Sequence, residues 1–433
     1  MTTTTVNETA SAGAARQAPV LPRLLPAAPE DLRHHLARYG PTPYRGQVGQ
    51  LISDIETSGL TGRGGAAFPV YRKLAIVARA RGRKVVVANG AESEPASRKD
   101  ELLLRAAPNL VLDGLQLAAE AVGATRAYLY VHPHPRLHQQ LGSALAARAA
   151  AGLDRAEVQL VTAPPRFLAG EESAVVSRIN GGPALPRFKI PPVHQRGVAG
   201  APTLVHNVET LAHLAQIARY GASWFRAAGA AAEPGTMLAT CRRADGTVEV
   251  VETAIGTPLG ELLRLPDLPA QAVLVGGYHG TWLTSAHAAA LPLANAALRP
   301  AGAAAGAGLL AALPHGRCGV TEAVRVVRYL AAESAGQCGP CLNGLPRIAA
   351  GLAELAAPRP RPGIRADLER WAGLAERRGA CHHPDGSVRF LRSALAIFGA
   401  ELTAHARGQC TATSSRPFLP VPAGIPASQA DWT

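Results

Sequence analysis

The first half of the chain alternates short apolar runs with longer segments of helical periodicity. Residues 85–88 (Val-Val-Val-Ala), 126–131 and 158–162 are short and apolar enough to be strands buried within a sheet. Residues 101–122 and 137–151, which separate them, carry the three- and four-residue apolar spacing of helices. Strands that alternate with helices predict a doubly wound or related α/β layer.

The pattern changes after residue 235. Short β-patterned runs at 236–241, 247–251 and 272–275 flank one helix near 259–263, which predicts a small α+β domain. Helical patterns at 319–332, 345–356, 364–378 and 387–406 predict a helical bundle. We therefore expect five segments: a mostly disordered tail at 1–45, an α/β domain at 46–235, a small domain with an Ala-rich linker at 236–305, a helical domain at 306–408 and a disordered tail at 409–433.

A glycine-rich loop precedes the first predicted strand. Residues 62–69 read Gly-Arg-Gly-Gly-Ala-Ala-Phe-Pro. Glycines let the backbone approach a ligand, and successive N–H groups in such a loop form a nest for an anion such as a phosphate. Arg63 adds a positive charge, and Phe68 offers a flat apolar face. The loop predicts a phosphate-bearing ligand with a ring to stack, and a plain turn is the alternative interpretation.

Polar residues also stand where open α/β sheets bind ligands, at the carboxyl ends of strands. Residues 89–95 (Asn-Gly-Ala-Glu-Ser-Glu-Pro) follow the first strand. Residues 167–173 (Phe-Leu-Ala-Gly-Glu-Glu-Ser) open one helix, and residues 205–210 (Val-His-Asn-Val-Glu-Thr) begin another. The first stretch also fits an acidic turn, and the carboxylates of the second also suit a helix N-terminus.

The chain carries a formal net charge of +13, mostly from arginine. It has no long block of consecutive basic residues and no aromatic-plus-basic motif, so we expect no nucleic-acid partner. Docking to an acidic protein or holding anionic cofactors accounts better for the charge. The sequence shows neither a signal peptide nor an apolar run that would span a bilayer, which predicts a cytoplasmic protein.

Six cysteines, two of them in a Cys-x-x-Cys pair, indicate metal ligation rather than a disulfide framework. Cys338 and Cys341 form the pair, and Cys381 follows between two predicted helices. An iron–sulfur cluster, a zinc ion shared with His382 or His383, and an empty site are all compatible with these ligands. A cluster's fourth ligand has these candidates: Cys318, His382, His383, or a solvent or substrate molecule.

Together these motifs resemble the family of NADH-binding, FMN- and [4Fe–4S]-containing flavoprotein subunits (51 kDa) of respiratory complex I and related diaphorases, over roughly residues 45–405. The family's Gly-Arg-Gly-Gly-Ala-Gly-Phe-Pro differs only at Ala67. Its Asn-Ala-Asp-Glu-Ser-Glu-Pro-Gly corresponds to residues 89–96, with Ala91 for aspartate. Its Tyr-Ile-Cys-Gly-Glu-Glu and Val-Asn-Asn-Val-Glu-Thr correspond to residues 167–172 and 205–210, with His206 for an asparagine. Its Glu-Ser-Cys-Gly-x-Cys-x-Pro-Cys corresponds to residues 333–341, with Ala335 for the first cysteine.

The resemblance implies a Rossmann-like α/β flavin domain, a small ubiquitin-like α+β domain and a C-terminal helical iron–sulfur domain. It implies that NAD(P)H is oxidised through FMN, and that electrons pass to a cluster and on to a ferredoxin-like or other protein partner. Cys338, Cys341 and Cys381 would hold a [4Fe–4S] cluster, or, given Ala335, a [3Fe–4S] cluster or none. The chain would lie peripheral to a membrane complex, and no side chain need act as a catalytic acid or base. A non-catalytic or cluster-less assembly or docking subunit is the alternative.

The resemblance also implies a set of cofactor-binding residues. The glycines of the loop would approach the FMN, Phe68 would stack on the nicotinamide nucleotide, and Lys73 would lie near the flavin phosphate. The full set expected to bind FMN or the nucleotide is Gly62, Arg63, Gly64, Gly65, Phe68, Lys73, Asn89, Glu92, Ser93, Glu94, Gly170, Glu171, Glu172, His206, Asn207 and Thr210.

Overall fold

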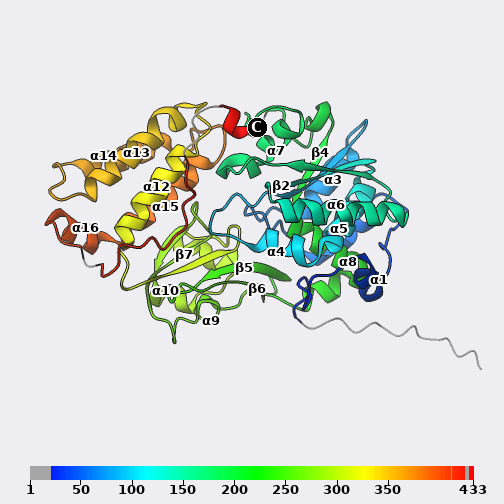
Figure 1. The fold of residues 1–433 in the computed structure, drawn as a ribbon, viewed down its shortest axis with the longest axis horizontal. Coiled ribbons are helices and arrows are strands. Elements are labelled where there is room, and N and C mark those ends of the chain that lie inside the picture. The colour runs from blue at the N-terminus through cyan, green and yellow to red at the C-terminus, as the bar shows by residue number, and fades with distance from the viewer. Residues whose placement is uncertain (1–20, 189, 411, 425–428) are drawn as a thin grey trace, which may run out of the picture.

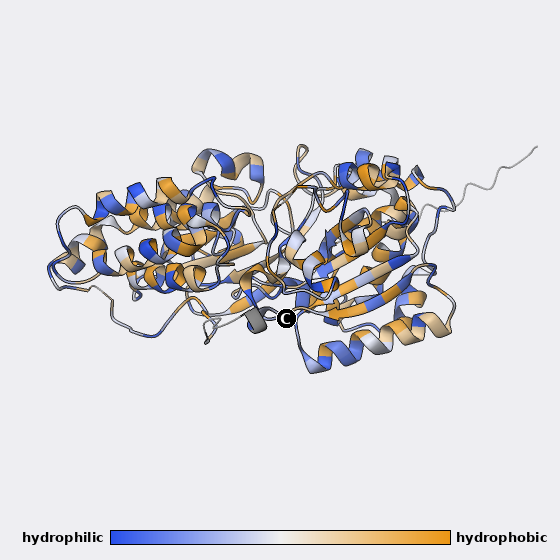
Figure 2. Cartoon of the chain, turned by 90° about the horizontal axis from the view of Figure 1, so that it is seen from above, coloured by the Kyte–Doolittle hydropathy of each residue, from blue (hydrophilic) through white to orange (hydrophobic). Residues whose placement is uncertain are grey.

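The computed structural model describes residues 21–188, 190–410, 412–424 and 429–433. An α/β layer, a mixed β-sheet and a group of helices follow one another along the chain, at the right, lower middle and left of Figure 1. Figure 2 shows apolar residues along the strands, between the layers of helices. Among the described residues, no helix combines the length and apolar character needed to cross a membrane.

The first sheet has four parallel strands in the order β3-β2-β1-β4, which confirms the expected α/β layer. Successive side chains of a strand point to opposite faces, so Val86 packs into one core and Val87 into another. Helices α5 and α8 cover the first face, and α7 covers the second. The elements of this layer are α1 (Leu32–Tyr39), α2 (Gln50–Ser58), α3 (Val70–Arg79), β1 (Val85–Gly90), α4 (Lys99–Ala106), α5 (Pro108–Val122), β2 (Arg126–Val131), α6 (Pro135–Ala150), β3 (Glu157–Thr162), α7 (Glu172–Ile179), β4 (Thr203–Asn207) and α8 (Val208–Arg226).

The second sheet is mixed, with five strands in the order β6-β5-β9-β7-β8. Its central strand β9 pairs parallel with β5 and antiparallel with β7. We expected the small domain to end at residue 305, and this boundary is wrong because β9 lies beyond it. The run Leu-Leu-Ala-Ala-Leu-Pro lacks β-branched residues, so its composition does not distinguish a strand from a helix. The elements are β5 (Thr236–Arg242), β6 (Val248–Ala254), α9 (Leu259–Leu263), β7 (Ala270–Val275), β8 (Thr281–Thr284), α10 (Ser285–Ala290), α11 (Asn295–Leu298) and β9 (Leu309–Pro314).

The helical part packs on one face of the second sheet. Leu274, Trp282 and Leu313 of the sheet share a core with Val327, Leu368 and Leu391 of the helices. The helix expected at 387–406 is two helices, α15 and α16, which meet at Phe398. The elements are α12 (Gly319–Ala332), a π-helical turn (Pro340–Gly344), α13 (Leu345–Leu355), α14 (Ile364–Ala375), α15 (His383–Ile397) and α16 (Gly399–Ala406).

The terminal segments are more ordered than the sequence predicts. Residues 1–20, 411 and 425–428 lie outside the described part of the chain. Within it, α1 is a helix and Leu24 is buried against the first core. Phe418 and Leu419 are buried against the helices, and both of their backbone N–H groups donate to the Glu322 carboxylate, at 2.8 and 2.9 Å. A few buried apolar residues hold these segments against the rest of the protein. Because these residues are not regularly spaced, the sequence shows no periodic pattern there.

Candidate functional site

The glycine loop forms one wall of a cavity of about 620 Å³. The loop connects α2 to α3, and Gly64 sits directly against Asn207, where an added Cβ would lie 3.2 Å from Asn207 Cβ. Gly65 has a φ of +110°, which side-chain-bearing residues rarely adopt. At residue 64 an added side chain would crowd Asn207, and at residue 65 the backbone conformation favours glycine.

The carboxyl ends of β1 and β4 form a second wall. The parallel register places Asn89 opposite Asn207, so the polar stretches that follow these strands meet at one edge of the sheet. The third stretch joins them, because Asn89 Nδ2 donates to Gly170 O at 2.9 Å and Gly170 N donates to Ser93 Oγ at 3.0 Å. The structure thus places fifteen predicted residues around one cavity: Gly62, Gly64, Gly65, Phe68, Lys73, Asn89, Glu92, Ser93, Glu94, Gly170, Glu171, Glu172, His206, Asn207 and Thr210.

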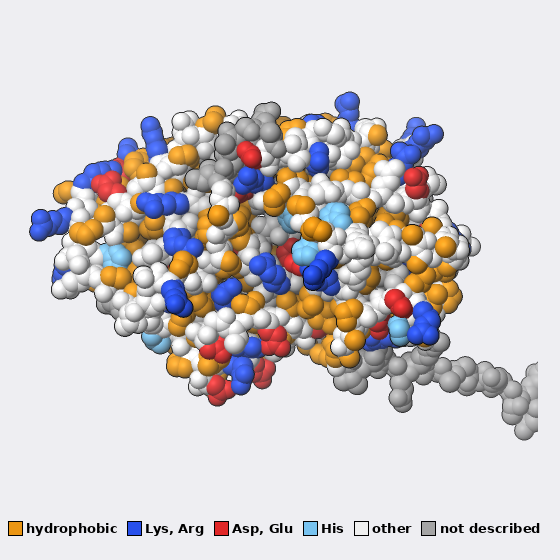
Figure 3. Space-filling view, viewed as in Figure 1, with side chains coloured by type: hydrophobic (Ala, Val, Ile, Leu, Met, Phe, Trp, Pro, Cys, Tyr) orange, Lys and Arg blue, Asp and Glu red, His pale blue; other side chains and the backbone are white. Residues whose placement is uncertain are grey.

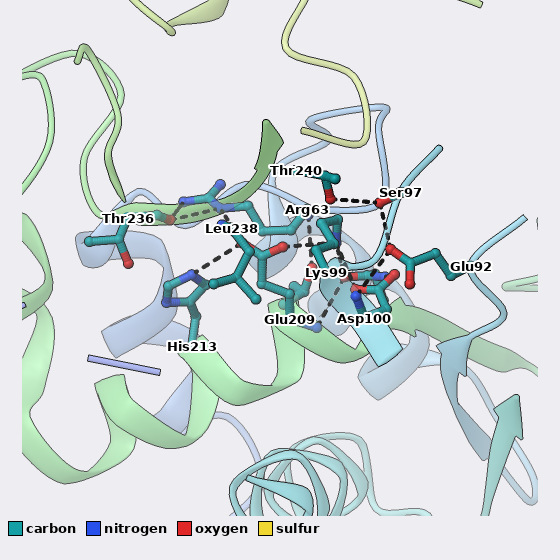
Figure 4. Close-up of polar contacts among 12 residues, drawn as sticks. Arg63, Glu92, Ser97, Lys99, Asp100, Glu209, His213, Thr236, Leu238 and Thr240 are labelled. Carbon is teal, nitrogen blue, oxygen red and sulfur yellow. Dashed lines mark hydrogen bonds and ion pairs between the residues drawn. The ribbon is translucent and has the colours of Figure 1, made fainter. Parts of the chain in front are cut away.

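Arg63 is the predicted residue that does not line this cavity. Its guanidinium points behind the loop, where Nε and Nη2 donate to Thr236 O at 3.1 and 3.0 Å and Nη1 donates to Thr61 O at 2.9 Å (Figure 4). Its backbone N–H donates to Thr210 Oγ1 at 2.9 Å. The expectation that Arg63 offers its charge to the ligand is wrong, because the side chain ties the loop to β5.

A buried charge network behind the wall was missed by the sequence analysis. Lys99 Nζ lies 2.7 Å from Asp100 Oδ1 and 2.8 Å from Glu209 Oε2 (Figure 4). Asn207 Nδ2 donates to Asp100 Oδ2 at 2.7 Å, so the network fixes an amide that faces the cavity. Burial opposes the ionisation of Glu209, but Lys99 outweighs it and the pKa of Glu209 falls to about 2. The adjacent Lys-Asp pair was a visible signal, but nothing in its spacing points to Glu209.

Phe68 and Lys73 are both in reach of a ligand at the cavity wall. The Phe68 side chain remains 42% exposed, which leaves its ring face available for stacking. Lys73 Nζ lies 2.8 Å from Glu172 Oε1, and both side chains line the cavity. The pair therefore keeps the Lys73 ammonium group in the cavity whose wall the glycine loop forms.

The three predicted cluster cysteines belong to the helical part. Cys338 precedes the π-helical turn, Cys341 lies within it, and Cys381 precedes α15. Burial raises the pKa of the Cys341 thiol to about 12, and the neighbouring Cys338 and Cys381 thiols contribute to the rise. The three cysteines are therefore neighbours in the structure. Cys381 also lines the cavity. A metal centre held by these thiolates would therefore stand next to a ligand of the glycine loop.

The protein candidates for a fourth cluster ligand are remote from the cysteines or have other partners. Cys318 caps the N-terminus of α12, whereas the cysteine pair follows its C-terminus. His383 Nδ1 contacts His279 Nε2 at 2.9 Å, and its Nε2 donates to Leu330 O at 2.8 Å. The His382 side chain is 85% exposed, and its Nδ1 contacts Asp385 Oδ2 at 3.1 Å. The described residues therefore fit a cluster with three thiolates and one non-cysteine position.

Aromatic and imidazole rings line the cavity together with Cys381. Phe167 meets His279 edge-on with ring centroids 4.8 Å apart, and both line the cavity with His383. Burial lowers the pKa of His383 to about 4 and that of His279 well below its usual range, so both rings are neutral at neutral pH. The sequence analysis missed His279, because it comes from the turn between β7 and β8 in the second sheet.

Comparisons with known proteins agree with this geometry. The Nuo51 FMN-binding domain matches residues 55–216, and the NADH-ubiquinone oxidoreductase-F iron-sulfur binding region matches residues 321–405. An NADH-quinone oxidoreductase subunit of Salmonella typhimurium is 30% identical over 375 residues, which cover 82% of this chain and 84% of that protein. The chain belongs to the Nuo51 family of NADH-quinone oxidoreductase subunits.

Other similar proteins extend the comparison. An NADH-quinone oxidoreductase subunit of Rhizobium meliloti is 29% identical over 391 residues, which cover 86% of this chain and 91% of that protein. The structure of an NAD⁺-reducing [NiFe]-hydrogenase in its H₂-reduced state superposes with a TM-score of 0.75 at 29% identity over 82% of this chain. The chain spans only 62% of that hydrogenase chain.

The cavity of this Nuo51 family member fits FMN. Among the described residues, Glu94 Oε1 and His206 Nε2 are buried side-chain atoms without a hydrogen-bond partner, and both residues line the cavity. Burial raises the pKa of Glu94 to about 8, so this carboxyl is mostly protonated at neutral pH. Burial, aided by Lys73, lowers the pKa of His206 to about 3 and keeps the imidazole neutral. A neutral acid and a neutral imidazole are suited to hydrogen bonds with a polar, anionic ligand.

Three departures from the family's motifs leave the shape of the site intact. Ala67 adopts a φ of +49°, the left-handed region that the family's glycine enters without strain. Ala91 lacks the family's carboxylate, but its backbone N–H still donates to Asn89 Oδ1 at 3.2 Å. His206 presents a ring nitrogen where the family has an amide. The changes therefore alter hydrogen bonds to the ligand rather than the course of the loops.

Proposed function

We propose that this chain oxidises NADH through FMN and passes the electrons to an iron–sulfur cluster held by Cys338, Cys341 and Cys381. The observation that carries the proposal is the continuity of the site: the cavity that begins at the glycine loop ends at Cys381. A flavin bound there and a cluster bound by the cysteines would be neighbours. The cofactor, when bound, supplies hydride acceptance and one-electron release, which no side chain can perform.

The residues of the cavity bind and orient. Backbone N–H groups around Gly64 and Gly65 would hold the flavin phosphate, with Lys73 as a nearby cation in the cavity lining. Asn89 and Asn207, near the carboxyl ends of β1 and β4, and Glu94, in the loop after β1, would fix the polar edge of the ring system. Phe68 would stack on the nicotinamide nucleotide from the exposed side.

The rings of Phe167, His279 and His383 shield the side of the cavity next to the cysteines. These rings contact one another, and their neutral state would lower the polarity of that space. Low polarity there favours electron transfer over side reactions of the cofactor with solvent.

For the organisation of the chain, we propose an α/β unit at 21–235, a unit at 236–314 and a helical unit at 319–424. The middle unit, with its five-stranded sheet and α9, would be the ubiquitin-like module of the family. A ferredoxin-like or other one-electron protein would accept the electrons. Figure 3 shows Lys and Arg side chains spread over the helical part of this face, and an acidic partner would match the +13 net charge.

The visible spectrum of anaerobically purified protein, before and after addition of NADH, tests the proposal. We expect flavin bands with a broad iron–sulfur contribution, and both should bleach on NADH. A flavin spectrum that does not bleach would favour the alternative, an assembly or docking subunit. A spectrum without either feature would overturn cofactor binding.

The variant Gly64→Val tests the flavin placement. An added Cβ already lies 3.2 Å from Asn207 Cβ, and the branched side chain would close the approach to the loop backbone. We expect loss of bound flavin with the iron content unchanged. Because Gly64 is remote from the cysteines in sequence, iron serves as the internal control for folding, and unchanged flavin would contradict the placement.

A further inference from the structure

A second group of metal-binding side chains lies at the other end of α12. Cys318 caps the N-terminus of this helix, His405 lies near the C-terminus of α16, and Cys410 follows α16. At about 1.5 Å per residue, α12 holds this group roughly 20 Å from the cluster cysteines. In Figure 1, α16 lies at the left edge of the helical part, away from the α/β layer. Neither the flavin site nor the cluster uses these residues.

The ligand atoms have the spacing of a tetrahedral metal site. The sulfurs of Cys318 and Cys410 and a ring nitrogen of His405 all lie within 4.8 Å of one another. Cys318 Sγ is 3.3 Å from His405 Nε2. In a tetrahedral zinc site, Zn–S bonds of about 2.3 Å and Zn–N bonds of about 2.0 Å place sulfur and nitrogen about 3.5 Å apart. Small side-chain adjustments would bring the atoms around one ion.

The orientation of His405 favours a metal. Its Nδ1 lies 2.8 Å from Ala356 O, and a carbonyl can only accept, so Nδ1 carries the proton. In the neutral ring the lone pair is then on Nε2, which faces Cys318 Sγ. Metal-bound histidines are fixed in this way by a hydrogen bond from the other ring nitrogen.

The surroundings of Cys318 would also suit a cation. Its sulfur lies 3.3 Å from Glu401 Oε2 and 3.3 Å from His405 Nε2, and both of these atoms are acceptors. One thiol proton can satisfy only one of them. The sulfur itself accepts from Thr321 N at 3.3 Å, and Glu401 accepts from Val320 N at 3.2 Å, so the first turn of α12 stabilises negative charge on both groups. A metal cation bound by Cys318 would replace the thiol proton beside this carboxylate and imidazole.

We propose that Cys318, His405 and Cys410 bind a zinc ion as its three protein ligands, with the Glu401 carboxylate beside Cys318. Two thiolates and an imidazole select a borderline-soft metal such as zinc over magnesium or calcium. The ion would join α12, α16 and the C-terminal segment. That segment continues to Phe418 and Leu419, which pack against the helices, and to Pro420, whose carbonyl accepts from the Tyr278 hydroxyl of the second sheet. Zinc would therefore fasten the end of the chain across the helical part and the sheet.

Metal analysis of the full-length protein tests this proposal without any activity assay. We expect zinc in the wild-type protein and the loss of one zinc per chain in Cys410→Ser, with iron unchanged. Cys410 is exposed, so this variant should fold normally. Cys241→Ala, which removes a cysteine of the second sheet, is the matched control and should keep its zinc. Equal zinc in the wild type and Cys410→Ser would overturn the proposal.

Two further measurements separate zinc from its competitors. Cobalt added to metal-free protein should give the visible bands of tetrahedral thiolate coordination, and His405→Gln should abolish them. Alkylation under denaturing conditions without reductant should modify both Cys318 and Cys410, whereas protection of both would reveal a disulfide and overturn the site. Removal of zinc by a chelator should increase hydrogen exchange at residues 412–420, and unchanged exchange there would contradict the fastening role.

Discussion

Gly114 lies where α5 crosses α8 most closely, and Gly114→Ala connects the packing of the fold to the cofactor site. A Cβ at this position would lie 1.9 Å from Leu211 O and 2.4 Å from Leu211 C. Real Cβ contacts are essentially never shorter than 3.0 Å, so α8 would have to move by about 1.1 Å. Because the obstructing atoms belong to the backbone, no side-chain rotation can relieve the clash. Overpacking of this kind costs about 1–3 kcal/mol, against a gain of at most about 1 kcal/mol in helix propensity.

The same movement would disturb the flavin site. Leu211 follows Thr210, whose hydroxyl accepts the Arg63 backbone N–H and so holds the glycine loop against α8. We therefore expect Gly114→Ala to lower the midpoint of urea unfolding, followed by circular dichroism, and to weaken flavin retention. Gly142→Ala in α6 is the matched control, because an added Cβ there has no neighbour within 4 Å, and it should raise the midpoint slightly. A Gly114→Ala protein as stable and as flavin-rich as the Gly142→Ala protein would refute the reasoning.

The remaining predictions concern titration and the cluster. Burial raises the pKa of Glu94 to about 8, so the stability contributed by its bound proton is present below the unfolded pKa of about 4.3 and is lost as the pH rises toward 8. The unfolding free energy of cofactor-free wild-type protein should thus fall relative to that of Glu94→Gln by up to about 1.4 kcal/mol per pH unit over this range, and a constant difference would count against a buried acid. Ala335→Cys should supply the fourth thiolate and slow the loss of iron to a chelator, and equal rates would show that residue 335 does not face the cluster.

The sequence predicts the parts of the site that depend on neighbouring residues. Valine-rich β1, the glycine loop and the polar stretches after the strands are local patterns, and the parallel register then brings their ends together. The role of Arg63 could not be predicted, because its partner Thr236 lies in another sheet. Distance along the chain likewise hid Glu209 as the partner of Lys99, and it hid the proximity of Cys318 to His405 and Cys410. Strand β9 and the order of the C-terminal segment were not predicted for a different reason: alanine-rich and aperiodic sequences carry no clear secondary-structure pattern.

The acidic lining of the cavity is compatible with anionic ligands because each carboxyl is already compensated. Glu92 accepts from Asp100 N and Glu101 N at the start of α4, and Glu171 accepts from Ser173 N and Ala174 N at the start of α7. Asp100 is paired with Lys99 and Glu172 with Lys73, while burial keeps Glu94 largely protonated. Helix N-termini and lysines thus compensate these negative charges, and the N–H groups of the glycine loop remain available to a phosphate.

The family's additional aspartate is Ala91 here, so this member lacks one negative charge at the flavin edge. Only Glu94, once ionised above pH 8, would add uncompensated charge, so flavin and nucleotide binding should weaken in that range.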